Sequence, residues 1–256
     1  MNKTFSVFET IGESWRLTKG AKWAIFSPLL CLFLAELLAV VVVLGGIAIL
    51  HAMGLSAEVM TAISVLVGIA LGITLIYLLA GLFAGMMKVS IERGRGNSVS
   101  GKSGLHSFSR VTPVLLTLIL FVLFLLPGSL VQFIPGLDNK NVETQIIVTS
   151  IQMIYDLIVI PFLYLSLPFA VDKINSPFTA IASSFKAVRG NWSKLVGLFV
   201  MVDLIFLVFM LPFFLGSVFN IEAIAIIGGI FFAVSYIWLF PFMCIVQGVI
   251  YHKLAD

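Results

Sequence analysis

One short segment of the chain has the residue types and the spacing of a phosphate-binding loop. The segment "GNSVSGKS", residues 96–103, fits the pattern G-x-x-x-x-G-K-S, in which backbone N–H groups and a lysine hold the phosphates of a nucleotide. That chemistry needs a buried strand before the loop and a helix after it. The segment that leads into the loop, "GLFAGMMKVSIERGRG", reads instead as the end of an apolar helix. We therefore expect no nucleotide binding and no nucleotide hydrolysis.

Three acidic residues stand deep inside long apolar segments: Glu36 in "FLAELLAV", Asp156 in "MIYDLIVI" and Asp203 in "VMVDLIFL". A charge at the centre of a bilayer costs about 2.5–3.5 kcal/mol on insertion scales. No lysine or arginine lies at a similar depth to neutralise these acids. Two interpretations stay open: a proton or cation pathway or a site for a cationic group, or neutral carboxyl groups hydrogen-bonded to a backbone carbonyl or a hydroxyl.

The remaining polar residues form no recognisable catalytic or metal-binding set. Cys31 and Cys244 both lie in apolar runs, and the chain has no CxxC pair, no Cys/His cluster and no HExxH spacing. The histidines lie in loops or at segment ends, so no serine–histidine pair at membrane depth is visible. We expect a protein that is not an enzyme and that holds no metal and no cofactor.

The composition predicts which elements carry these residues. The chain is 61% hydrophobic and only 11% charged, whereas about a quarter of the residues in a soluble domain are charged. Six apolar stretches are long enough to cross a bilayer, which takes about 20 residues each. They span residues 24–50, 59–87, 112–134, 145–171, 194–219 and 222–249. We expect an all-α polytopic membrane protein, with residues 1–256 forming a single transmembrane domain of three helical hairpins.

Positive charge alternates between the connections of these six segments. The cations on one side are Lys3, Arg16, Lys19 and Lys22, then Lys88, Arg93, Arg95, Lys102 and Arg110, then Lys173, Lys186, Arg189 and Lys194, and finally Lys253. The connections on the other side contain only Lys140. Because lysine and arginine are retained in cytoplasmic loops, both termini are expected in the cytoplasm.

The chain also contains an internal repeat. The segment "SVFETIGESWRLTKG", residues 6–20, matches "SPFTAIASSFKAVRG", residues 176–190, position by position. A fainter third copy is "SGLHSFSRV", with Phe108 in the place of Phe185, and Pro161-Phe162 recurs as Pro241-Phe242. We expect three repeats, at about residues 1–90, 98–172 and 175–251. Each would comprise a cytoplasmic-side helix followed by a membrane hairpin.

The cytoplasmic-side helices are amphipathic. In the last copy Phe178, Ile181 and Phe185 share one helical face, and the cations fall elsewhere around the helix. Such helices are expected to lie in the lipid interface, and packing against the membrane spans is compatible with that position. Seven cations are candidate contacts for lipid headgroups: Arg16, Lys19, Arg93, Arg95, Lys102, Lys186 and Arg189.

Two segments carry a resemblance to known proteins. They are "GMMKVSIERGRGNSVSGKSGLHSF" after the second span and "LPFAVDKINSPFTAIASSFKAVRGNWSKLVGLF" after the fourth. With the three-hairpin plan, they resemble the bacterial six-helix membrane proteins of the YciC type. The membrane domain attached to some glycerophosphodiester phosphodiesterases is similar. The resemblance implies a bacterial inner-membrane protein. It transfers no catalytic residue, because no soluble segment of these 256 residues is long enough to hold the phosphodiesterase domain.

These observations lead to two functional hypotheses. The first is a non-enzymatic integral membrane protein with a lipid-interacting or scaffolding role, whose partners are the bilayer and its anionic headgroups. A membrane-protein partner or a second copy of the chain stays open, whereas nucleic acid and nucleotide are not expected. The alternative is a small proton- or cation-coupled transporter that uses Glu36, Asp156 and Asp203.

Overall fold

The computed structural model describes residues 4–54, 56–105, 109–133, 142–173 and 176–255, and every element in these ranges is helical. Lys3, Phe108 and Lys140, which enter the sequence analysis, lie outside the described residues. The long elements are α2 (Lys22–Ala52), α3 (Ala57–Gly94), α5 (Val111–Leu130), α6 (Val142–Leu163), α9 (Trp192–Val218) and α10 (Glu222–Ala255). The short ones are α1 (Val7–Thr18), α4 (Gly101–Leu105), α7 (Ser166–Asp172) and α8 (Pro177–Val188), with the 3-10 turn η2 (Val131–Phe133) after α5.

Six of these helical segments are long and apolar enough to cross a membrane, as the sequence predicts. Helices α6 and α7 together make the fourth segment, interrupted by a turn at residues 164–165. Helices α2, α3 and α10 have 31, 38 and 34 residues and so exceed the bilayer minimum by a third or more.

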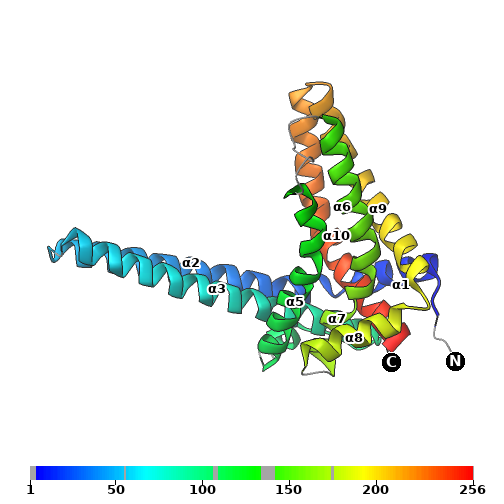
Figure 1. Ribbon diagram of the computed structural model, residues 1–256, viewed down its shortest axis with the longest axis horizontal. Coiled ribbons are helices and arrows are strands. Elements are labelled where there is room, and N and C mark those ends of the chain that lie inside the picture. The colour runs from blue at the N-terminus through cyan, green and yellow to red at the C-terminus, as the bar shows by residue number, and fades with distance from the viewer. Residues whose placement is uncertain (1–3, 55, 106–108, 134–141, 174–175, 256) are drawn as a thin grey trace.

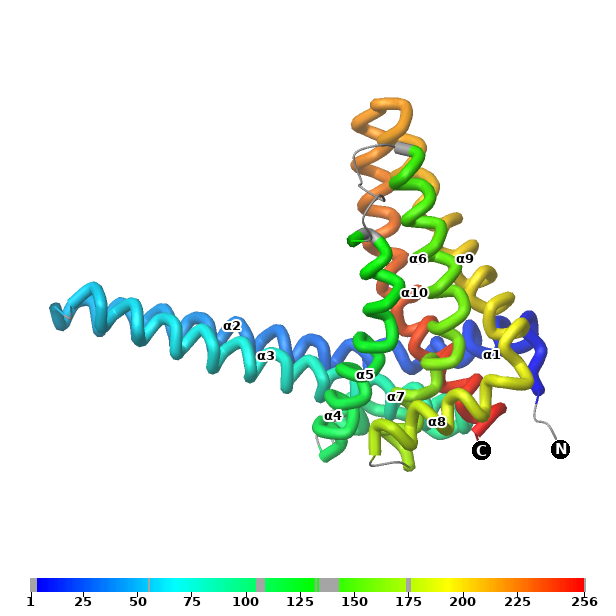
Figure 2. Tube along the Cα trace, viewed as in Figure 1, coloured from blue at the N-terminus to red at the C-terminus, as the bar shows by residue number. Residues whose placement is uncertain are grey.

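The long helices fall into two groups. Helices α5, α6, α9 and α10 stand beside one another, and α2 and α3 run side by side away from them, across their direction (Figure 1 and Figure 2). Helix α2 buries only residues near its start, the last of them Pro28, and α3 buries only residues from Ala80 onward. We call residues 29–79 the projecting arm; the side chains of its described residues, 29–54 and 56–79, are exposed or half-buried. Its apolar surface needs lipid or a partner to cover it.

The projecting arm joins the rest of the protein where α3 crosses α10. At this crossing Gly94 and Gly248 face the partner backbones, and a Cβ at Gly94 would lie 2.6 Å from the Gly248 carbonyl oxygen. A Cβ at Gly248 would in turn overlap the Ser90 carbonyl group. Only glycine allows two helices to approach this closely. Tyr251 and Phe242 of α10 are fully buried beside the crossing.

Proline chemistry explains the break between α6 and α7. Pro168 has no N–H to donate to the carbonyl of Tyr164, four residues earlier, so that carbonyl needs another donor. Gln247 of α10 supplies it, with 2.5 Å between its Nε2 and the Tyr164 oxygen. A side chain of α10 therefore satisfies a backbone carbonyl of the fourth segment. Lipid has no donor in the bilayer core that could do this.

Helix α8 completes the hydrogen bonding at this break through one serine. The Ser184 hydroxyl donates to the Phe162 carbonyl oxygen at 2.5 Å and accepts the Leu165 N–H at 3.1 Å. In the repeat alignment the equivalent of Ser184 is Ser14 of α1, which packs against α10. Helix α10 continues without a break, and the buried Ser14 hydroxyl has no hydrogen-bond partner among the described residues.

These two serines give a matched pair of substitutions. Ser184→Ala leaves one carbonyl and one N–H unsatisfied in the protein interior, so the free energy of unfolding should fall by about 1–3 kcal/mol. Ser14→Ala removes a hydroxyl that is already unpaired, so stability should stay within about 0.5 kcal/mol or rise. Thermal unfolding in detergent micelles, followed by circular dichroism, measures both. Equal losses for the two variants would show that the hydrogen bonds at the break do not explain the role of Ser184.

Candidate functional site

Helices α6, α9 and α10 line an open cavity of about 670 Å³, in which Asp156 is half-buried and Asp203 is exposed. Asp156 of α6 and Asp203 of α9 both line this cavity, so the structure brings together two of the three acids that the sequence singles out. Glu36 is not among the lining residues, because it belongs to α2 in the projecting arm. The sequence could identify the three acids by their depth but could not show that only two of them share a site.

The cavity wall combines a few polar groups with an apolar majority. Its polar side chains come from Thr149, Gln152, Asp156, Tyr164 and Asp203. Its apolar side chains come from Met153, Leu157, Ile160, Phe199, Val202, Met243 and Val246. This volume and mixture are typical of small-ligand sites. The described lining residues include two acids but no lysine, arginine or histidine. The charge of the cavity therefore suits a proton or a cation and not an anion.

Helical spacing explains why these side chains share one wall. Thr149, Gln152 and Asp156 are separated by three and four residues, which is one face of α6. Phe199 and Asp203 are four residues apart on α9. Thr149 and Gln152 are site residues that the sequence analysis missed. Their spacing relative to Asp156 could have identified them, because polar side chains are scarce in a bilayer-spanning helix.

The seven candidate headgroup cations have different environments in the structure. Arg93 of α3 binds the C-terminal end of α1: its Nε donates to the Leu17 carbonyl oxygen at 3.0 Å, and its Nη2 donates to the Lys19 carbonyl oxygen at 3.0 Å. Carbonyls at a helix C-terminus lack helical partners, and a basic side chain is a favourable donor for them. Arg93 therefore serves the attachment of α1 to α3.

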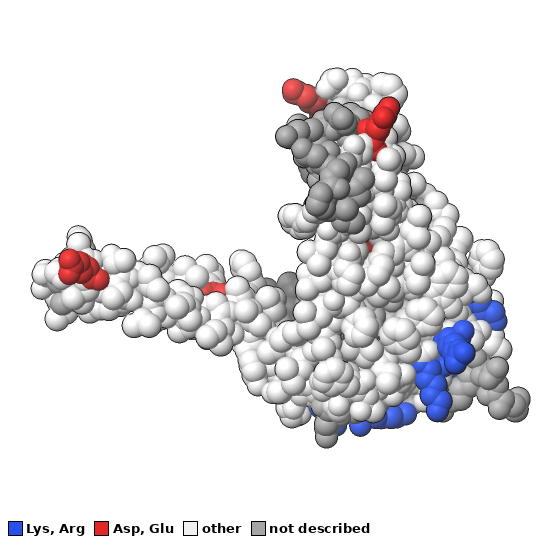
Figure 3. Space-filling view, in the orientation of Figure 1, with Lys and Arg blue, Asp and Glu red and all other residues white. Residues whose placement is uncertain are grey.

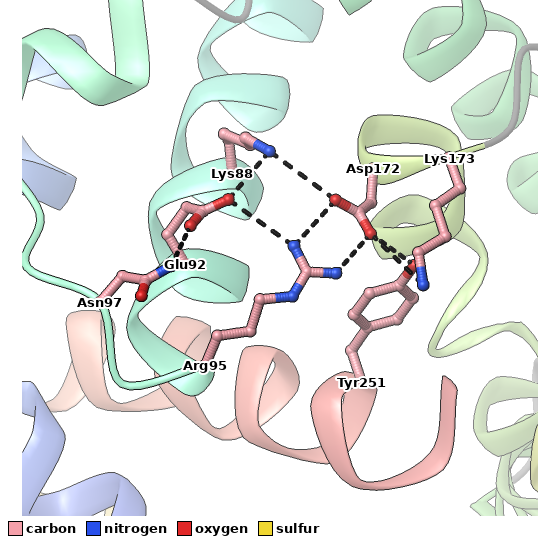
Figure 4. A network of polar contacts seen from close by, with 7 residues as sticks. All are labelled: Lys88, Glu92, Arg95, Asn97, Asp172, Lys173 and Tyr251. Atoms are coloured by element: carbon pink, nitrogen blue, oxygen red, sulfur yellow. Dashed lines mark hydrogen bonds and ion pairs between the residues drawn. The ribbon is translucent and has the colours of Figure 1, made fainter. Parts of the chain in front are cut away.

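Arg95 forms a bidentate ion pair with Asp172 at the end of α7 (Figure 4). The two Nη–Oδ distances are 3.0 and 2.6 Å, and the Asp172 side chain is only 6% exposed. Tyr251 of α10 donates its hydroxyl hydrogen to the same carboxylate at 3.1 Å. The carboxylate thus joins α3, α7 and α10. The guanidinium of Arg95 points at this acid, which the sequence does not reveal because the two residues are far apart in the chain.

Further contacts extend this network along α3. Lys88 lies 3.0 Å from Glu92 and 3.7 Å from Asp172, measured between the nearest nitrogen and oxygen atoms. Asn97 donates its side-chain N–H to Glu92 at 2.6 Å, as Figure 4 shows. Bidentate and charge-assisted hydrogen bonds are the stronger kinds in proteins. We call these contacts of Lys88, Glu92, Arg95, Asp172 and Tyr251 the junction network.

Lys102 is exposed on the short helix α4. Close packing explains one glycine of the "GNSVSGKS" pattern and the glycine that follows the pattern: a Cβ at Gly101 would lie 2.5 Å from the Ser27 hydroxyl oxygen, and one at Gly104 would lie 2.7 Å from the Pro28 ring. These glycines allow α4 to lie against α2. No strand precedes the loop in the described part of the chain, since α3 runs into it. The surroundings of a phosphate-binding loop are therefore not found there.

Arg16 and Lys19 near the end of α1, and Lys186 and Arg189 near the end of α8, are exposed and form no ion pair with a described residue. Their surroundings differ. Arg16 shares a shallow hollow with Glu9 and Glu13. Lys186 and Arg189 share one with Phe162 and Phe185 and with no acid among its described lining residues.

Comparison of the chain with protein-family models, with curated proteins and with solved structures gave no match. The described residues contain no group of three or more His, Cys, Asp and Glu side chains that could hold a metal ion. The class that the helices define is that of a multi-pass helical membrane protein.

The junction network gives a stability prediction. Asp172→Asn removes the charge that faces the partly buried guanidinium of Arg95, so the free energy of unfolding should fall by roughly 3 kcal/mol. Glu9→Gln is the control, because Glu9 is exposed and forms no ion pair with a described residue. It should change stability by less than about 0.5 kcal/mol. Chemical unfolding in detergent measures both, and an Asp172→Asn variant as stable as the control would contradict the network's role.

Proposed function

We propose that the protein is a non-enzymatic integral membrane protein of the bacterial inner membrane, with a lipid-interacting or scaffolding role. The observation that carries this proposal is the surface of α1 and α8. It combines four cations that have no ion-pair partner among the described residues with exposed aromatic side chains, Phe8 at 73% and Phe178 at 69%. Cations and aromatic rings on one helix are typical of an interfacial position, where the rings enter the acyl region and the cations meet headgroup phosphates.

The distribution of charge supports cytoplasmic termini. In Figure 3 the lysine and arginine side chains gather at the end of the molecule where α8 and both chain termini lie. Acidic side chains are visible at the far tips in Figure 3. Helices α3, α6 and α10 each have an acid in the first turn: Glu58, Glu143 and Glu222. Retention of positive charge on the cytoplasmic side favours this orientation.

Two equivalent aromatic contacts support the three-repeat architecture. Trp15 of α1 packs on Phe242 of α10, with ring centroids 5.3 Å apart, and Phe185 of α8 packs on Phe162 of α6, at 4.9 Å. In the repeat alignment Trp15 corresponds to Phe185, and Phe242 corresponds to Phe162. Each amphipathic helix would therefore dock on the second span of another repeat, and α4 beside α3 would complete the set. This plan is consistent with the resemblance to the YciC type.

Neutralising the four cations tests the lipid proposal. The variant Arg16→Gln, Lys19→Gln, Lys186→Gln, Arg189→Gln should retain at least tenfold less phosphatidylglycerol than the wild type, because each cation near anionic lipid contributes about 1 kcal/mol. Native mass spectrometry of protein released from mixed phosphatidylglycerol and phosphatidylethanolamine nanodiscs measures the retained lipid. Exchanging each arginine for lysine and each lysine for arginine preserves charge and should preserve retention. Equal retention by the neutral variant and the wild type would overturn the proposal.

Proton- or cation-coupled transport is the second candidate function. The observation that favours it is the shared cavity of Asp156 and Asp203. Two carboxyl groups in one largely apolar cavity can each bind a proton or another cation. Binding of either neutralises the carboxylate and so lowers the free-energy cost of keeping it inside the membrane. The position of Glu36 outside the cavity separates it from this candidate pathway, so the proposal involves two of the three acids.

Proton flux into liposomes tests this candidate. Vesicles that contain the protein and a pH-sensitive dye should acidify under an imposed membrane potential faster than protein-free vesicles. Asp156→Asn and Asp203→Asn should each abolish the difference in acidification rate, because an amide does not bind and release a proton at the pH of the assay. Glu36→Gln is the matched control and should leave the flux unchanged. Wild-type vesicles that acidify no faster than protein-free ones would exclude the transport hypothesis.

A further inference from the structure

A second hollow, of about 440 Å³, lies between the end of α6 and the outer face of α8. Its described lining residues are Phe162, Phe185, Lys186 and Arg189. One part of its wall is therefore aromatic and the other part is cationic. The volume is within the range of small-ligand sites, and the hollow is separate from the acidic cavity, with which it shares none of these residues.

The local structure fixes both parts of this wall. The hydrogen bonds of Ser184 to the break after α6 hold α8 in place. The next residue, Phe185, then stacks on Phe162 with an interplanar angle of 10°. Lys186 and Arg189 are three residues apart, so they occupy the same side of the helix end. Neither has an ion-pair partner among the described residues, which leaves two positive charges beside an aromatic surface.

Charge and polarity identify what this hollow would bind. Two adjacent cations attract an anion, and the planar guanidinium of an arginine fits two oxygens of a phosphate group. The negative end of the α8 dipole opposes an anion by about 0.3–1 kcal/mol, which is less than the roughly 1 kcal/mol that each of two cations contributes near lipid phosphate. The rings of Phe162 and Phe185 offer an apolar surface to the part of the ligand next to the phosphate.

The surface beside the hollow favours a lipid over a soluble phosphate. On α6 the side chains of Ile154 and Ile158 precede Phe162 by eight and four residues, on the same helical face. They are 59% and 48% exposed. An acyl chain can therefore follow this strip of α6 into the bilayer, while its phosphate stays with Lys186 and Arg189. A soluble phosphate would leave the apolar surface uncovered.

We propose that the hollow between α6 and α8 binds one anionic glycerophospholipid, with its phosphate at Lys186 and Arg189 and its glycerol and chains against Phe185, Phe162 and α6. The inference rests on the proposed lipid-interacting function and gives that function a defined site. The corresponding surface of α1 is a poorer site, because Arg16 shares its hollow with two acids, Glu9 and Glu13.

Two pairs of matched variants test the site. The measurement is the affinity for phosphatidylglycerol, from native mass spectrometry titrations of delipidated protein in detergent. Lys186→Gln with Arg189→Gln should weaken binding of the first lipid at least tenfold, which corresponds to about 1.4 kcal/mol. Arg16→Gln with Lys19→Gln, the same charge change on α1, should weaken it less than threefold. Phe185→Ala should weaken it several-fold, whereas Phe33→Ala, at a 59% exposed phenylalanine of the projecting arm and outside the hollow, should not.

The outcomes separate this inference from the proposed function. If the wild type binds phosphatidylglycerol no better than phosphatidylethanolamine, both are wrong. If the wild type prefers phosphatidylglycerol and the α1 pair removes that preference while the α8 pair does not, the proposed function stands and this site is wrong. Competition by millimolar inorganic phosphate would show a soluble ligand and overturn the lipid assignment. Lys186→Arg with Arg189→Lys should restore binding, and its failure to do so in a protein of wild-type thermal stability would also overturn the site.

Discussion

The carboxylate of Asp172 is the point at which the two groups of helices are joined by charge. Arg95 of α3 binds it through two hydrogen bonds, and Tyr251 of α10 adds a third. The projecting arm buries almost nothing along its length, so its attachment depends on its base. There the contacts of this carboxylate, the close crossing at Gly94 and Gly248, and an apolar cluster of the start of α2 and the end of α3 with α10 hold it. An ion pair at this position favours one arrangement of the helices, because movement of α3 away from α7 would break both hydrogen bonds from Arg95 to Asp172.

The sequence predicts the elements well and their pairing poorly, for physical reasons. Apolar length alone locates six bilayer-spanning helices, because the cost of unsatisfied backbone groups in lipid leaves few alternatives. The same reasoning finds Asp156 and Asp203 by depth. Their common cavity depends on which face of α6 meets which face of α9, and no local pattern contains that information. Arg93 and Arg95 looked like surface cations for the same reason, since their partners lie more than 70 residues away in the chain.

Two segments of similar sequence, residues 6–20 and 176–190, have different surroundings in the structure. Ser14 and Ser184 occupy equivalent positions, as do Trp15 and Phe185. Helix α8 meets a partner broken by proline, and its serine completes the hydrogen bonding there. Helix α1 meets the continuous helix α10, and its serine hydroxyl has no hydrogen-bond partner in the described part of the chain. The acids on α1 distinguish the copies further, because Glu13 pairs with Lys253 at 2.8 Å. Equivalent sequence positions therefore do not imply equivalent binding surfaces.

The crossed arrangement of the projecting arm and the other four long helices has a mechanical consequence. Because α2 and α3 run across the direction of the other four long helices, both groups can span one flat bilayer only if the arm turns about its base. At about 1.5 Å per residue, the part of α2 in the arm, residues 29–52, makes a lever of roughly 36 Å. Its fulcrum is the glycine crossing, where the helix axes approach within about one helix diameter, on the order of 10 Å. A shift of 1 Å at the junction would therefore move the tip by several ångströms. Conversely, forces that lipid exerts on the arm act on the contacts around Asp172 at its base.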